Sequence, residues 1–197
     1  MMRELNTRER LLNIAEHLFA ENGIDSVSIR SINMAAQLSP GILHYHFGNK
    51  DTLLEAIVTR RIDEIVGYYQ TMISSLSHHT PPSSRDVADI LIMPLANFVS
   101  NNKQSGLSYL RLIAKLHGNK SETLSTLSKR HKDQLLNPIQ QLLIKSCQHL
   151  STEQLSLRIS FASNAIVQSV CNWPIDKEEL DLQATQLATF IAAGLNA

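Results

Sequence analysis

The chain has 197 residues, 43% of them hydrophobic, and its 18 basic side chains balance 18 acidic ones, which excludes a protein coated in basic residues but allows a local basic patch. Two cysteines, Cys147 and Cys171, are too few for a disulfide scaffold and indicate buried thiols in a reducing cytosol. Neither the N-terminus nor the uncharged stretch 159–175 has the continuous apolar run of a signal peptide or a membrane span, so we expect a cytoplasmic protein with no membrane partner.

The first predicted helix begins near Thr7, because Asn6 and Glu9 have the spacing of a capping box. Its apolar residues recur at helical spacing as far as Phe19, and Gly23 is placed to end it as a C-terminal cap. We expect this helix to support the elements that follow and to offer its N-terminus to a phosphate.

Residues 27–50 predict two short helices separated by a tight turn. Ile29, Ile32 and Ala36 fall at helical spacing and give the first helix one apolar face. The turn follows at 37–39. This order is typical of a helix-turn-helix, the motif that places its second helix in a DNA groove.

The second of these helices should begin at Ser39, because serine is a favoured N-cap and Pro40 loses no hydrogen bond in a first turn. Leu43 and Phe47 lie one turn apart and form its apolar pair. The other residues lie on or beside the opposite side, which suits a nucleic-acid groove. They are Pro40, Gly41, Ile42, His44, Tyr45 and His46, and Ser39 at the start of the helix is a further candidate DNA contact.

Charge and side-chain chemistry over the same stretch favour DNA as the partner. No acidic residue occurs between Asp25 and Asp51, so this surface can approach phosphates. Gly41 allows close approach of the backbone, Ile42 suits a thymine methyl group and Arg30 suits a guanine. The donors for phosphate oxygens are His44, Tyr45 and Lys50.

The order of residues after the turn is more specific than the apolar pattern, which many small helical proteins share. It reads SPGILHYHF at 39–47, NKD at 49–51 and two leucines at 53 and 54. In this order the chain resembles the TetR family of bacterial transcriptional regulators. The resemblance extends over 7–56 and implies a three-helix DNA-binding domain, with Lys50 as a phosphate contact in the first turn of a fourth helix.

Three positions depart from the common pattern of that family. Asn33 stands where alanine is usual, Gln37 where glycine is usual and His44 where tyrosine is usual. A non-glycine residue in left-handed geometry costs on the order of 1–2 kcal/mol, so we expect the turn to be rebuilt around Gln37. We expect Asn33 to loosen the crossing of the two helices and His44 to make its phosphate contact sensitive to pH.

The fourth helix should begin after Asn49 and extend to about Leu76, which carries it out of the DNA-binding region. We place the two domains at 1–56 and 57–197. The adjacent histidines at 78 and 79 have no partners at ligand spacing, so they predict no metal site.

Helical patterns continue to the C-terminus, and no strand is predicted. Pro94 should kink the next helix, and a break should follow at 101–106. The fold class is therefore all-α, with about nine helices. The helices after the fourth are expected within 85–100, 107–116, 121–150, 151–172 and 176–194.

The second domain supports several hypotheses. Apolar helices with a kinking proline can enclose a cavity for a small-molecule inducer, while a helical domain that only dimerises, a helical enzyme and a helical adaptor are the alternatives. An enzyme would need a nucleophile, a base and an acid together, and we find no such motif, no phosphate loop and no metal-binding pair. We therefore expect no enzymatic activity and no cofactor, and an adaptor would leave the acid-free stretch unexplained. The candidate ligand-binding residues are Asn97, Tyr109, Asn164 and Gln168.

The expected function is that of a dimeric repressor, released from a palindromic operator in double-stranded DNA by an unknown inducer. One short helix contacts only a few base pairs, so two copies across successive major grooves are needed for specificity. The final two helices are the expected homodimer interface, because 156–170 mixes small and larger apolar residues. These are Phe161, Ala162, Ser163, Ala165, Ile166 and Val167.

Overall fold

The computed structural model describes residues 7–76, 81–117 and 137–197, and within these ranges all regular structure is helical. This confirms the all-α fold class. A short helix at 137–146 accompanies seven labelled helices. Their bounds are α1 Thr7–Asn22, α2 Ile29–Ala35, α3 Ile42–Phe47, α4 Lys50–Ser74, α5 Ser84–His117, α7 Thr152–Cys171 and α8 Lys177–Asn196.

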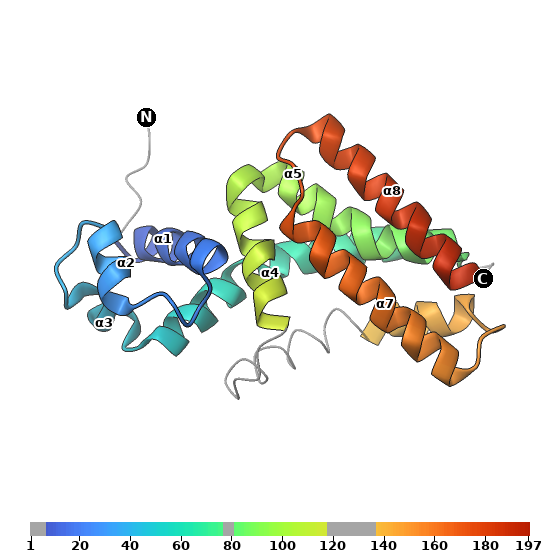
Figure 1. The fold of residues 1–197 in the computed structure, drawn as a ribbon, viewed down its shortest axis with the longest axis horizontal. Coiled ribbons are helices and arrows are strands. Elements are labelled where there is room, and N and C mark those ends of the chain that lie inside the picture. The colour runs from blue at the N-terminus through green and yellow to red at the C-terminus, as the bar shows by residue number, and fades with distance from the viewer. Residues whose placement is uncertain (1–6, 77–80, 118–136) are drawn as a thin grey trace.

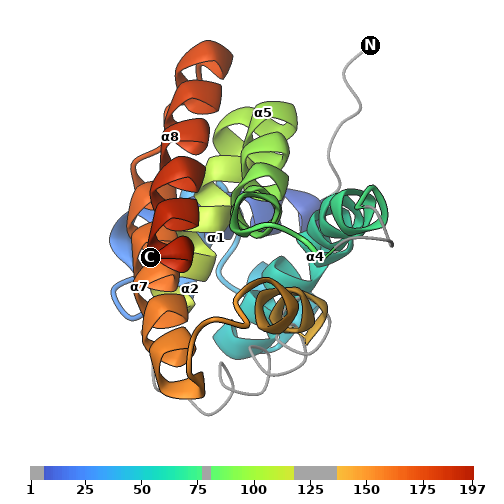
Figure 2. The ribbon, with the colours of Figure 1, turned by 90° about the vertical axis from the view of Figure 1, so that its right-hand side faces the viewer.

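The helices form two regions that α4 joins (Figure 1). The first three helices lie together at one end, and α4 begins beside them and runs toward the opposite end, where it packs against α5. The helices α7 and α8 lie next to each other and also contact α5 (Figure 2). Among the described helices, none is long and apolar enough to cross a membrane.

Local side-chain caps start several helices at the predicted residues. The side chains of Asn49, Ser151 and Asp176 accept backbone N–H bonds at the starts of α4, α7 and α8. Each such cap stabilises its helix by about 1 kcal/mol. Gly23 follows the end of α1 with a φ of 82°, a left-handed conformation that glycine adopts without a steric penalty.

The helix α5 consists of two helices joined at a kink. Its backbone is non-helical at Lys103, with φ 53° and ψ −134°, whereas Pro94 lies inside the first half. The kink therefore lies within the predicted break and not at the proline. Gly106 allows the chain to turn here, because a Cβ atom at this position would lie 2.8 Å from the Cβ of Asn102.

One apolar core extends through both regions. It includes Phe19 and Phe47 at the end formed by the first three helices, and Phe98 and Tyr109 where α5 turns. The last two rings meet edge to face, with their centroids 5.7 Å apart. Because α4 buries residues along most of its length in this core, the two regions share their packing.

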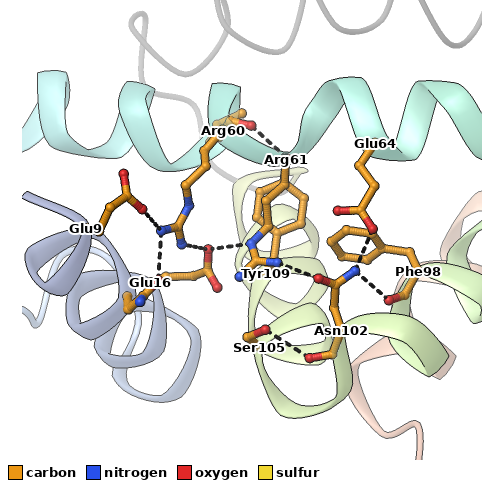
Figure 3. A network of polar contacts seen from close by, with 11 residues as sticks. Glu9, Glu16, Arg60, Arg61, Glu64, Phe98, Asn102, Ser105 and Tyr109 are labelled. Atoms are coloured by element: carbon orange, nitrogen blue, oxygen red, sulfur yellow. Dashed lines mark hydrogen bonds and ion pairs between the residues drawn. The ribbon is translucent and has the colours of Figure 1, made fainter. Parts of the chain in front are cut away.

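A buried ion-pair network joins α1 to α4 (Figure 3). The Glu16 side chain is 2% exposed, and its Oε2 accepts hydrogen bonds from Nη2 of Arg60 at 2.8 Å and Nε of Arg61 at 3.3 Å. Through Nη1, Arg60 also donates to Asn13 at 2.7 Å and to Glu9 at 3.2 Å. The buried carboxylate is therefore paired with two guanidinium groups, as a buried charge requires.

The same network reaches the kink of α5 through Arg61. Its Nη1 donates to Oδ1 of Asn102 at 3.0 Å, and Nδ2 of Asn102 donates to Oε1 of Glu64 at 2.7 Å (Figure 3). The residue after Asn102 is the kink residue Lys103. These bonds hold the start of the kink against α4.

The second half of α5 holds the C-terminal ends of two other helices. The ammonium group of Lys115 donates to the backbone carbonyls of Ala20 and Glu21, in the last turn of α1. Arg111 donates through Nε to the carbonyl of Cys171 at 2.8 Å and through Nη1 to the Glu21 carboxylate at 3.3 Å. Cations at helix C-termini complement the helix dipole, so this half of α5 ties α1 to α7.

Candidate nucleic-acid interface

The first helix of the predicted motif, α2, begins with a capping box. Ser28 is the N-cap, and Ser31 takes part in reciprocal 3.0 Å hydrogen bonds with it. The helix buries Ile32 and leaves Arg30 exposed. The guanidinium proposed to reach a base edge is therefore accessible.

The second helix, α3, begins later than predicted. Its first residue is Ile42, whose backbone N–H donates to the carbonyl of Ser39 at 3.1 Å in a turn. The N-cap is Gly41, which has no side chain to accept a hydrogen bond, so Ser39 does not act as the predicted cap. Leu43 and Phe47 are its buried residues, as the spacing predicts.

In the turn between the two helices, a residue other than glycine adopts the left-handed conformation. Gln37 has a φ of 52°, and the next residue, Leu38, donates its backbone N–H to the carbonyl of Asn33 at 2.9 Å. The turn is therefore not rebuilt around Gln37, and the surrounding hydrogen bonds hold this residue in a conformation that costs on the order of 1–2 kcal/mol.

Asn33 ties α2 to α3, contrary to the expectation that it would loosen their crossing. Its side chain is 2% exposed. Nδ2 donates to the carbonyl of Pro40 at 2.9 Å, and Oδ1 accepts from the backbone N–H of Leu43 at 3.3 Å. An amide of this length spans the space between the helices, which alanine would not do.

The residues predicted to contact DNA all retain exposure. Tyr45 is 83% exposed, and its ring meets that of His46 edge to face with centroids 5.2 Å apart. Lys50 is the first residue of α4, and its ammonium group lies 5.8 Å from the centroid of the Phe19 ring. Among the other candidates, Ser39, Pro40, Gly41 and His44 are exposed, while Ile42, His46 and Lys50 are half-buried.

One exposed side chain of this surface, Met34, was not predicted from the sequence, and two arginines of α1 lie against α2 and α3. Met34 is 74% exposed on α2, next to the buried Asn33, and it lies off the apolar face, a signal that the helical spacing already contained. The guanidinium of Arg8 lies 5.1 Å from the centroid of the Phe47 ring, which brings a cation from α1 beside α3. Arg10 donates to the carbonyl of Ala36 at the end of α2.

The four candidate ligand-binding residues do not surround one site. Burial raises the pKa of Tyr109, and its hydroxyl stays protonated and donates to the carbonyl of Val58 at 2.8 Å. Asn97, Asn164 and Gln168 are exposed. Within the described ranges, no cluster of histidine, cysteine, aspartate or glutamate could hold a metal ion.

The helices α7 and α8 carry large apolar side chains that nothing in the described chain covers. Phe161 is 67% exposed on α7, and Phe190 is 69% exposed on α8. On the same two helices, Leu157 is 58% exposed and Leu182 is 60% exposed. Exposed apolar side chains gathered on neighbouring helices are typical of a protein–protein interface.

Comparisons with known proteins agree with this geometry. Residues 11–57 match the family model for bacterial regulatory proteins of the tetR family, and residues 89–194, more than half of the chain, match the model for the tetracyclin repressor-like C-terminal domain. The HTH-type transcriptional regulator UidR of Escherichia coli (strain K12) is 34% identical over 70 residues, 36% of each protein. The HTH-type transcriptional repressor KstR2 of Rhodococcus jostii (strain RHA1) is 35% identical over 68 residues, 34% of this chain and 33% of that protein. The matched segments thus span about a third of these relatives.

Solved structures with the same fold match almost the whole chain. A TetR-family transcriptional regulator from Bordetella parapertussis 12822 has a TM-score of 0.73 at 14% identity and covers 95% of both chains. The transcriptional regulator FadR from Bacillus subtilis, solved in complex with stearoyl-CoA, has a TM-score of 0.65 at 14% identity and covers 94% of this chain and 98% of its own. With both family models matched and this fold shared, the chain belongs to the TetR family of bacterial regulatory proteins.

Proposed function

We propose that the protein is a dimeric, sequence-specific transcriptional repressor whose α3 enters the major groove of a palindromic operator. The observation that carries this proposal is the exposed surface of α2 and α3. It presents Arg30 and Tyr45 and has no carboxylate between Asp25 and Asp51. Such a surface meets phosphates without charge repulsion and leaves side chains free for base edges. As a regulator of bacterial genes, it would act in the cytoplasm.

The dimer in this proposal forms through α7 and α8, whose Phe161 and Phe190 are exposed and covered by nothing in the described part of the chain. Two-fold pairing would place two copies of α3 in successive major grooves, roughly 34–36 Å apart. Asn164 and Gln168 are exposed on the same helix as Phe161, one and two turns away, so we assign them to this interface and not to a ligand cavity.

Selection of bound DNA from a random pool tests the proposal directly. The expected product is an imperfect palindrome whose half-sites are centred about 10 base pairs, or a multiple of this, apart. A pool that shows no enriched sequence, with a protein that is folded, would contradict sequence-specific binding.

Substitution of the two cations should separate phosphate contact from base contact. Lys50→Ala should weaken binding to all sequences about equally and reduce the salt slope by about one unit, since in this proposal Lys50, the first residue of α4, contacts the DNA backbone. Arg30→Ala should relax preference at one base pair by about 1–3 kcal/mol. Titrations of selected and random DNA at several salt concentrations measure both, with Lys145→Ala, an exposed lysine of the helix at 137–146, as the control. Equal losses for selected and random DNA in Arg30→Ala would remove Arg30 from base recognition.

We further propose that a small, largely apolar molecule binds the helical region 57–197 and releases the protein from DNA. Support comes from α4, which begins at Lys50 and is held at Arg61 to the kink of α5, so a tilt caused in one region reaches the other. The FadR structure holds stearoyl-CoA, which is an acyl-chain ligand in a protein of this fold. The division of the chain at 1–56 and 57–197 follows from this assignment of roles.

Linkage provides the test of the inducer. A ligand found by thermal-shift screening should lower operator affinity about 5- to 150-fold, and operator DNA must lower ligand affinity by the same factor, because coupling of about 1–3 kcal/mol is reciprocal. Titration of that ligand with and without operator measures the coupling. Unchanged ligand affinity would favour the alternative in which the second region only dimerises.

A further inference from the structure

We infer that Asn33 is the residue that fixes the position of α3, by supplying from α2 the helix cap that α3 lacks. This inference rests on the proposed DNA-binding function, because the position of α3 matters through the bases that it reads. It assigns to a buried side chain a role in specificity without contact with DNA.

The cap is missing because of the local sequence. The first turn of any helix has backbone N–H groups without intrahelical partners, and a side chain at the N-cap usually accepts from one of them. At α3 the N-cap is Gly41, and no side chain of the helix itself makes this bond. Oδ1 of Asn33 accepts from the backbone N–H of Leu43 instead, ten residues along the chain, at 3.3 Å.

The same amide also fixes the chain that leads into α3. Its Nδ2 donates to the carbonyl of Pro40 at 2.9 Å, so one planar group holds a donor at Leu43 and an acceptor at Pro40. Both bonds start from a side chain that is 2% exposed and packed within α2. The start of α3 is thus held by a buried side chain of α2, outside the helix itself.

Because α3 is short, it depends on these hydrogen bonds from Asn33 for its position. With six residues, α3 is far too short to be stable alone, so its placement depends on contacts with its neighbours. Its buried Leu43 and Phe47 contribute apolar packing, which holds the helix down but is weakly directional. Hydrogen bonds depend strongly on distance and angle, so the Asn33 pair restricts rotation and sliding of α3 along its own axis.

The test compares Asn33→Ala with Ser151→Ala, which removes the N-cap of α7 in the other region and serves as a matched loss of a helix cap. For each variant, affinity for the selected operator and for random DNA of equal length is measured at a temperature where the protein is folded. Asn33→Ala should lower the ratio of the two affinities about tenfold, as expected for two lost hydrogen bonds, and leave the affinity for random DNA nearly unchanged. Ser151→Ala should reduce thermal stability with the ratio intact. A ratio unchanged in Asn33→Ala would overturn the inference.

Amide hydrogen exchange without DNA separates failure of this inference from failure of the proposed function. Exchange at Leu43 should be faster in Asn33→Ala than in the parent protein or in Ser151→Ala, whether or not any DNA is bound. Equal exchange at Leu43 would overturn the cap itself. If Asn33→Ala does not fold, Asn33→Ser is measured in the same way, since its short hydroxyl side chain cannot span both Pro40 and Leu43 and it buries no charge. It should lose part of the affinity ratio, and a ratio equal to that of the parent protein would overturn the inference.

Discussion

We expect Arg60→Ala to lower the free energy of unfolding by about 3 kcal/mol, the low end of the range for a buried ion pair that loses one partner, because Arg61 still pairs with Glu16. Glu16 would remain 2% exposed with a single guanidinium, that of Arg61, at 3.3 Å. The Nη1 bonds to Asn13 and Glu9 would be lost as well. Urea unfolding followed by circular dichroism measures the change, provided that the slope with denaturant stays the same.

The matched control is Arg85→Ala, which breaks an exposed ion pair and an exposed hydrogen bond to the hydroxyl of Thr189. Arg85 pairs with Asp89 across one turn of α5 at 2.9 Å, with 44% and 29% of the two side chains exposed. Such pairs contribute only about 0.3–0.5 kcal/mol. A loss in Arg60→Ala as small as that in Arg85→Ala would show that solvent reaches Glu16 and that the network is not a buried one.

The second large effect is expected at the α7 and α8 surface. Phe161→Asp should convert the proposed dimer to a monomer and lower operator affinity by at least about 100-fold. Each phenyl ring contributes about 1.5–3 kcal/mol when buried, and two-fold symmetry counts the substitution twice. Light scattering after size exclusion gives the mass, and a titration with operator DNA gives the affinity.

Tyr45→Asp is the control for this experiment, because Tyr45 is 83% exposed on α3 and equally aromatic. It should weaken DNA binding and leave the mass of the assembly unchanged. If Phe161→Asp remains dimeric while the parent protein is a dimer, the interface lies elsewhere on the molecule.

The sequence was sufficient wherever structure depends on residues three or four apart. The caps by Asn49, Ser151 and Asp176 are of this kind, because each side chain bonds to a backbone N–H within the next turn. The end of α1 at Gly23 follows from one residue's conformational freedom. The family resemblance likewise lies in one continuous stretch.

The errors involve residues far apart in the chain. The start of α3 was misplaced because its cap comes from Asn33, ten residues before the bonded amide of Leu43. The kink of α5 lies at Lys103, next to Asn102, which bonds to α4. The position of Pro94 in the sequence does not predict this location. Hydrogen bonds between residues this far apart depend on how the helices pack, so a local sequence pattern cannot predict them.

Arg111 links the proposed dimer interface to the DNA-binding helices within each chain. Its guanidinium group contacts the end of α7 at the carbonyl of Cys171 and the end of α1 at the Glu21 carboxylate. It therefore connects the proposed dimer interface to the DNA-binding helices. Two-fold symmetry repeats this contact in the other subunit. A change in the angle between the DNA-binding helices and the dimer interface therefore occurs twice, and both changes affect the distance between the two copies of α3. In the proposed dimer, the distance between the two copies of α3 is therefore set in part by contacts within each chain.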